Sequence, residues 1–232
     1  MFELFETVEE KDKQAAIKEI IEHASPRREF FVLVSLAVAM ASFGVLLDST
    51  VVLIGSMLIA PILYPILSLS LGVTLGDEKL IARSGYTLFK SVVLAVAAST
   101  VIGFLFTSRG IDTLVVVDVI SRGEPSLIYA IIAGISGFAA ALALVKPNMN
   151  EMLPGVAIAV SLVPPLAMAG VGLSAFNLSL VANALLLFIV NVAGIVLCAM
   201  FVFAMLKISK QQHVVDAAVK KDEKIVEEQK SD

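Results

Sequence analysis

Long stretches without a charged residue are the feature that most constrains this sequence. Five such runs cover residues 30–47, 49–76, 91–108, 125–145 and 152–206. Of the 38 charged residues, 13 lie within residues 1–29 and 12 within residues 207–232. Only 16% of the chain is charged, whereas a soluble domain usually has about 25%. We therefore expect an integral membrane protein with two polar tails.

The lengths of these runs predict the number of membrane crossings. A helix needs about 20 apolar residues to cross the hydrocarbon core, so the run of 55 residues at 152–206 must turn once, at the polar stretch 174–179. Lipid offers the backbone no hydrogen bonds, and no run alternates like a barrel strand, so every span should be helical. We predict an all-α membrane domain with six transmembrane helices, at residues 30–47, 50–74, 86–107, 126–145, 153–173 and 179–206.

Basic residues near the ends of the spans predict the orientation. With six spans, the side that holds both tails has eight Lys and Arg residues, and the opposite side has only Arg109 and Arg122. We expect a multi-pass protein of the plasma membrane with both termini in the cytoplasm and no cleavable signal peptide. Its predicted parts are a cytoplasmic amphipathic helix at 1–29, the membrane domain at 30–206 and a charged cytoplasmic tail at 207–232, of which residues 210–232 form a frayed helix or a disordered segment.

The composition and the motifs of the sequence argue against several functional classes. A net charge of −4 without a basic cluster makes nucleic acid an improbable partner. Cys198 is the single cysteine, and His23 and His213 both lie in the tails, so we expect no metal site. The sequence lacks a zinc-binding His-Glu-x-x-His motif, a nucleophile elbow and a phosphate-binding loop, so we expect neither an enzyme nor a cofactor.

Prolines interrupt two of the predicted spans. Pro61 and Pro65 lie within the second span, and Pro164 and Pro165 lie within the fifth. A proline inside a helix removes an amide donor and clashes with the preceding turn. Both helices should therefore be broken in the middle.

The two halves of the membrane domain also align with each other. A shift of 100 positions without gaps superimposes three glycine or proline pairs, namely Gly55 on Gly155, Pro65 on Pro165 and Gly72 on Gly172. It also carries span one onto span four and span three onto span six. Because three is an odd number of crossings, the second copy would be inverted. We predict inverted three-helix repeats at about 30–107 and 126–206, an arrangement typical of secondary transporters that is also found in channels and scaffolds.

Two segments resemble a known family. They are GSMLIAPILYPILSLSLGVTLGD at 55–77 and LPGVAIAVSLVPPLAMAGVGL at 153–173. In these motifs and across roughly residues 30–206, the chain resembles a prokaryotic membrane family named for a domain of unknown function, number 389. The resemblance implies a membrane architecture and supplies no substrate.

The candidate site residues cluster around the two predicted breaks. For substrate binding we predict Ser56, Pro61, Pro65, Ser68, Ser161, Pro164, Pro165, Asn183 and Asn191. For a gate or vestibule we predict Asp48, Asn148, Asn150 and Glu151. Each has a structural alternative, since Asp48 and the 148–151 group suit helix caps, and the two span-six asparagines suit hydrogen bonds between helices.

The sequence favours a transporter of an unidentified small solute or ion, with a site at the membrane midplane. Two alternatives remain: a structural or regulatory membrane protein that recruits a partner through its tails, and a channel. The expected partners are the lipid bilayer and further copies of the chain in a homo-oligomer, because abundant small residues suit close helix contacts.

Overall fold

Apolar helices make up almost all of the structure. The computed structural model describes residues 8–107, 127–146 and 161–231, together with positions 149, 153, 155 and 156. Nine α-helices and no strand occur within these residues. The predicted all-α class is confirmed for the described part of the chain.

The helices follow one another with short connections. The first half contains α2 (Glu10–His23), α3 (Arg28–Leu46), α4 (Thr50–Ile59), α5 (Leu63–Leu75) and α6 (Glu78–Thr107). The second half contains α8 (Leu127–Val145), α10 (Val163–Ser174) and α11 (Leu178–Met205), followed by a short 3₁₀ helix (Ile208–Gln211) and α12 (Gln212–Ser231).

Five of these units have the length and composition of membrane spans. Four are the continuous helices α3, α6, α8 and α11, and the fifth is the pair α4 and α5, whose axes are bent by 52°. The predicted span at 153–173 is described mainly by α10, whose 12 residues are about 18 Å long and too short to cross alone. The described residues thus support a membrane location with four or five spans.

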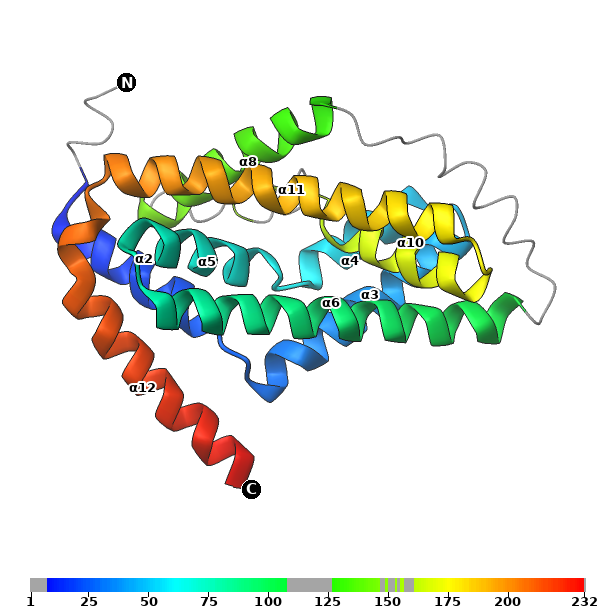
Figure 1. Ribbon diagram of the computed structural model, residues 1–232, viewed down its shortest axis with the longest axis horizontal. Coiled ribbons are helices and arrows are strands. Elements are labelled where there is room, and N and C mark those ends of the chain that lie inside the picture. The colour runs from blue at the N-terminus through cyan, green and yellow to red at the C-terminus, as the bar shows by residue number, and fades with distance from the viewer. Residues whose placement is uncertain are drawn as a thin grey trace.

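The long helices α6 and α11 run in opposite directions along the bundle (Figure 1). The turn between α5 and α6 lies at the end that holds α2 and α12, and the turn between α10 and α11 lies at the opposite end. We call these the tail end and the far end of the bundle. The core lies between them, where α10 packs on α6 and α3, and α11 packs on α8 and α5.

The same backbone turn occurs at both ends. Gly76 and Phe176, 100 positions apart, adopt left-handed conformations with φ of 67° and 54°. In each turn the amide of the following residue donates to the carbonyl of a glycine at the preceding helix end, Gly72 or Gly172, at 2.9 Å. The first turn therefore recurs in the second half of the chain.

The helix that follows each turn also begins in the same way. The side chain of Asp77 accepts a hydrogen bond from the Leu80 amide at 3.0 Å, and that of Asn177 accepts one from the Leu180 amide at 2.9 Å. A short polar side chain at this position satisfies an amide that has no partner inside the helix. The Asp77 cap explains why α6 begins at Glu78, eight residues before the predicted start of the third span at 86.

The C-terminal segment differs from the prediction of a frayed or disordered tail. Residues 212–231 form α12, which packs against α2. Val215, Val219 and Asp222 are buried on one face of this helix. Such a stripe is too short to predict a coiled coil, but here it finds an apolar partner in α2, whose Ile17, Ile20 and Ile21 are also buried.

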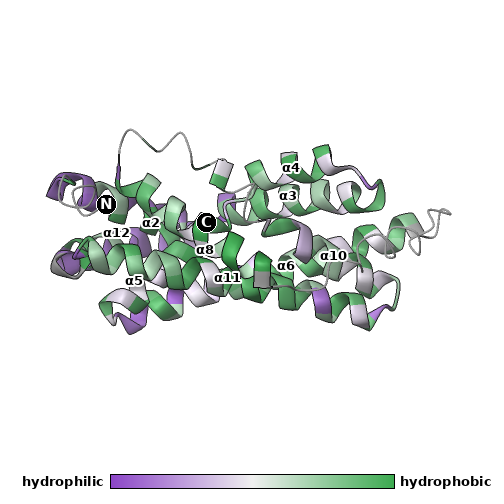
Figure 2. Ribbon diagram, turned by 90° about the horizontal axis from the view of Figure 1, so that it is seen from above, coloured by the Kyte–Doolittle hydropathy of each residue, from purple (hydrophilic) through white to green (hydrophobic). Residues whose placement is uncertain are grey.

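Hydrophilic residues concentrate around α2 and α12 at the tail end, and hydrophobic residues cover the rest of the bundle (Figure 2). Large apolar side chains are exposed along the membrane helices, among them Phe89, Ile189 and Leu197. Outward-facing apolar side chains on long helices are what a lipid environment requires.

Candidate functional site

The first break separates α4 from α5. α4 ends at Ile59, and Ala60 is extended, with φ of −74° and ψ of 122°. A residue before proline is driven out of the helical region by the proline ring, and Pro61 follows Ala60. α5 resumes at Leu63. The break therefore lies at residues 60–62, within the predicted second span.

Pro65 has a different role from Pro61. It is the third residue of α5 and is buried. Amides in the first turn of a helix have no partner inside the helix, so a proline is tolerated there. Pro61 therefore lies in the break, and Pro65 lies in the first turn of the helix that follows.

At the predicted second break, both prolines lie in the helix that follows. α10 begins at Val163, so that Pro164 and Pro165 both lie in its first turn and are buried. Just before it, Ser161 adopts a left-handed conformation with φ of 48°. The helical half that would precede this break falls largely outside the described residues.

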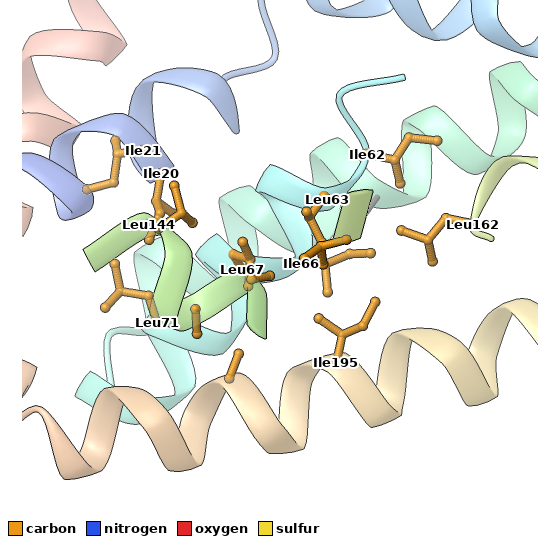
Figure 3. Close-up of a cluster of buried hydrophobic side chains, with 14 of the residues drawn as sticks. Ile20, Ile21, Ile62, Leu63, Ile66, Leu67, Leu71, Leu144, Leu162 and Ile195 are labelled. Carbon is orange, nitrogen blue, oxygen red and sulfur yellow. The ribbon is translucent and has the colours of Figure 1, made fainter. Parts of the chain in front are cut away.

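The first break and the start of α10 meet inside the bundle. A cavity of about 10 Å³ lies between them, lined by Met57, Ala60, Ile62, Leu63, Leu162 and Val163. This volume is close to that of one water probe. Figure 3 shows the apolar packing here, from Ile20 and Ile21 of α2 through Leu67 of α5 to Leu162 beside the second break.

A larger hollow of about 230 Å³ opens beside the first break. Its lining includes Pro61, Tyr64, Leu67, Leu144 and Leu153, and no charged side chain. Leu144 belongs to α8, so this hollow lies between the broken span and the first helix of the second half. The apolar lining could receive a solute only where backbone groups or Tyr64 supply the polar contacts.

The predicted serine ligands lie away from both spaces. Ser56 is fully buried and donates to the Leu53 carbonyl at 2.6 Å. Ser68 accepts a hydrogen bond from the hydroxyl of Ser84 in α6 at 2.7 Å. Ser161 is half-buried and lines neither space. Ser56 therefore bonds within its own helix α4, and Ser68 joins α5 to α6.

The remaining predicted residues are placed as follows. Asn191 of α11 is 3% exposed and Asn183 is half-buried, and neither lines the two spaces. Asp48 is exposed in the turn between α3 and α4, with φ of 49°. Asn148, Asn150 and Glu151 lie outside the described residues. Of the nine predicted substrate-binding residues, Pro61 alone lines one of these two spaces.

Sequence reasoning missed the apolar residues that line the cavity. The available signal was position in the sequence. Ala60, Ile62 and Leu63 lie within two residues of Pro61, and Leu162 and Val163 lie within two residues of Pro164. Among the described residues, no group of three His, Cys, Asp or Glu could hold a metal ion.

The tail helices cover one side of this region. α2 packs on α5 and α8 as well as on α12. The Tyr64 hydroxyl donates to Glu19 of α2 at 3.2 Å, and the Tyr64 ring stacks on His23 with centroids 4.7 Å apart. The second residue of α5, just after the first break, is thus linked directly to the N-terminal helix.

An ion cluster joins the tail helices to the membrane helices. Asp222 of α12 is buried and pairs with Arg83 of α6 and with Arg27, whose Nε lies 3.1 Å from one carboxylate oxygen. A second nitrogen of the Arg27 guanidinium, Nη1, lies 3.7 Å from the Glu22 carboxylate. One carboxylate therefore connects the C-terminal helix, the N-terminal segment and the start of α6.

Comparison with known proteins agrees with the architecture. Residues 57–197 match the family described as domain of unknown function, DUF389. Uncharacterized protein MJ0678 of Methanocaldococcus jannaschii is 33% identical over 186 residues, which are 80% of this chain and 57% of that protein. The chain thus spans little more than half the length of this relative. No solved structure matches the chain. The family match includes both breaks and the helices between them, so the chain belongs to the family defined by domain of unknown function 389.

Proposed function

We propose that this protein is a membrane transporter that moves a small solute or ion through a site at its two helix breaks. The observation that carries the proposal is that two helix starts, Leu63 and Val163, border the same cavity. Paired broken helices that meet inside a bundle are the usual site of secondary transporters.

The proposal includes six spans arranged as two inverted three-helix repeats. Its support is the turn that recurs after 100 positions, together with the opposite directions of α6 and α11 (Figure 1). Under this proposal, residues 153–174 form the broken helix that corresponds to α4 and α5.

The chemistry of the proposed site would come from the backbone. The last four carbonyls of α4 have no partner within their own helix, and they lie beside the start of α5. Helix ends of this kind coordinate ions or polar groups when a break opens. Since the cavity is only about 10 Å³, the arrangement would be a closed state that must widen to admit a solute.

We further propose a plasma-membrane location with the tail end in the cytoplasm, assembly as a homo-oligomer and a role without catalysis. The tail end carries Arg27, Arg28, Lys79 and Arg83, and basic residues favour the cytoplasmic side. Reporter domains fused to the C-terminus and inserted at Asp48 would test the orientation. The proposal expects the first in the cytoplasm and the second outside.

Thiol accessibility tests the transport path. In a Cys198→Ala background, we would place Ala60→Cys and Leu162→Cys beside the cavity, with Ala95→Cys as a matched control that is fully buried away from it. Sealed vesicles of known orientation would be treated with a membrane-impermeant thiol reagent on either side. The proposal expects labelling at 60 and 162 and protection at 95.

Equal protection of all three cysteines, with ready labelling of Asp48→Cys, would contradict a water path to the breaks. A structural or regulatory role would then be favoured, as the apolar lining of both spaces also suggests. If the path is open, saturating flux in proteoliposomes would indicate a carrier, and conductance without saturation would indicate a channel.

A further inference from the structure

The turn between α10 and α11 combines two unfavourable features. Phe176 adopts a left-handed conformation, which crowds any side chain with a Cβ atom and which glycine adopts at the equivalent position 76. Its ring is also 82% exposed. The ring makes an edge contact with Phe104, with centroids 6.1 Å apart. Little within the described chain offsets the strain or covers the ring.

The two equivalent turns have the same backbone but different chemistry. Positions 76, 78 and 79 are exposed, as are positions 176, 178 and 179. At the tail end the last two are Glu78 and Lys79, and at the far end they are Leu178 and Ser179. Because the backbone is the same, the difference reflects what surrounds each turn. The charged residues of the tail-end turn are compatible with water. The exposed phenylalanine and leucine of the far-end turn are compatible with an apolar environment.

Two polar side chains of the far-end turn bond to the backbone. Ser174 is buried and donates to the Val171 carbonyl at 2.7 Å. The Asn177 side chain caps α11 through the Leu180 amide. Leu178 is 73% exposed, so the surface of the turn is dominated by Phe176 and Leu178.

The length of α11 fixes the depth of the turn. Its 28 residues extend about 42 Å, and a typical tilt of about 20° leaves about 39 Å along the membrane normal. Lys207 follows at the tail end. A membrane is about 40–45 Å thick with its headgroup regions. If Lys207 lies at one headgroup region, the far-end turn reaches the opposite one and does not extend into bulk water.

We infer that Phe176 and Leu178 insert into the lipid interface at the far end of the bundle, at the boundary between headgroups and acyl chains. The occupant of this surface is lipid because exposed apolar side chains of α11, Ile189 and Leu186, lead along the helix to Leu178 at the turn. Aromatic side chains are commonly found at this depth. The inference holds for any membrane function of the chain and does not depend on transport.

A single tryptophan can measure this depth, because the sequence contains none. Phe176→Trp keeps an aromatic side chain at the site. Ile189→Trp, near the middle of α11 and 59% exposed, is the control for the membrane centre, and Lys224→Trp, exposed on α12, is the control for water. Each full-length variant would be reconstituted in liposomes with lipids brominated near the headgroup or near the chain end, and with iodide on both sides.

We expect Trp emission at position 176 to be quenched most by the shallow bromines, at 189 by the deep bromines and at 224 by iodide. Emission at 176 should also be shifted to the blue of that at 224. Leu178→Trp provides a second probe of the same turn if substitution at 176 disturbs folding, and it should show the same pattern. Quenching at 176 and 178 by iodide as strong as at 224 would overturn the inference. Protection from all three quenchers would also overturn it, since another protein surface would then cover the turn.

Discussion

Contacts between the membrane helices and contacts between the two tail helices are built in opposite ways. Within the bundle, α8 and α11 approach so closely that a Cβ atom on Gly137 would lie 2.6 Å from the Cα of Ile195. At the tail end, α12 packs on buried isoleucines of α2, and its Asp222 pairs with Arg27, just before α3, and with Arg83 of α6. Lipid provides no hydrophobic force between helices, so small residues and close backbones hold them together. The tail helices meet outside the apolar spans, where apolar burial and charge pairing can both contribute.

The largest effect is expected from adding a side chain at a glycine where two membrane helices touch. Gly137→Val would place side-chain atoms against the backbone of Ile195, which cannot move aside, so we expect a loss of about 3 kcal/mol. The midpoint of unfolding in a denaturing-detergent titration measures it. Gly85→Val is the matched control, because a Cβ there meets nothing within 4 Å. Similar midpoints for the two variants would contradict close packing as the stabilising feature.

Removing the tail carboxylate should release α12 while leaving the bundle intact. Asp222→Asn leaves Arg27 and Arg83 without their shared counter-charge, and because both are partly exposed, at 21% and 15%, we expect a loss of about 2 kcal/mol in docking. Faster trypsin cleavage within α12, with an unchanged bundle midpoint, is the expected result. Asp216→Asn, exposed on the same helix, should leave cleavage unchanged. Unchanged cleavage in both variants would show that apolar contacts alone hold α12 in place.

The contact between Gly103 of α6 and Ser174 of α10 tests whether a side chain or the backbone limits how closely two membrane helices pack. A Cβ on Gly103 would lie 2.2 Å from the Ser174 hydroxyl, which can rotate away, and 2.8 Å from the Ser174 Cβ, which cannot. Gly103→Ala should therefore cost about 1.5 kcal/mol. Combining it with Ser174→Gly should recover much of the lost stability. No recovery in the double variant would show that the α6 and α10 backbones, and not this side chain, limit the contact.

The smallest effect concerns the link between the two regions. Tyr64→Phe removes the hydrogen bond to Glu19 and keeps the ring stacked on His23, so we expect a loss of about 1 kcal/mol or less. Faster proteolysis within α2 would report it. Tyr86→Phe, whose side chain is 61% exposed on α6, is the control. Unchanged proteolysis in both variants would show that apolar packing alone holds α2.

The position of the first break could be predicted because proline acts on its own helix. Pro61 lies in that break, within the predicted second span, and the paired Gly72 and Gly172 accept the hydrogen bonds that close the two equivalent turns. The lining of the cavity could not be predicted, because the side-chain directions of Ala60 and Leu162 depend on a bend of 52° and on a second helix.

The order of α12 was missed for a similar reason. Its apolar stripe of Val215 and Val219 is too short to be informative alone and gains meaning only beside α2. Nothing in the sequence around Asp222 indicates that it is buried. Its charge is paired by Arg27 and Arg83, which are distant along the chain. Long-range pairs of this kind leave no local pattern.

The bend at residues 60–62 also determines how far the distal end of α5 would move if α5 rotated relative to α4. The 13 residues of α5 extend about 20 Å, so a rotation of about 10° would displace its distal end by about 3 Å. At that end Asp77 accepts a hydrogen bond from Gln212 of α12 at 3.2 Å. A displacement of about 3 Å is enough to break this hydrogen bond. A change in the bend between α4 and α5 would therefore alter a contact of the C-terminal helix.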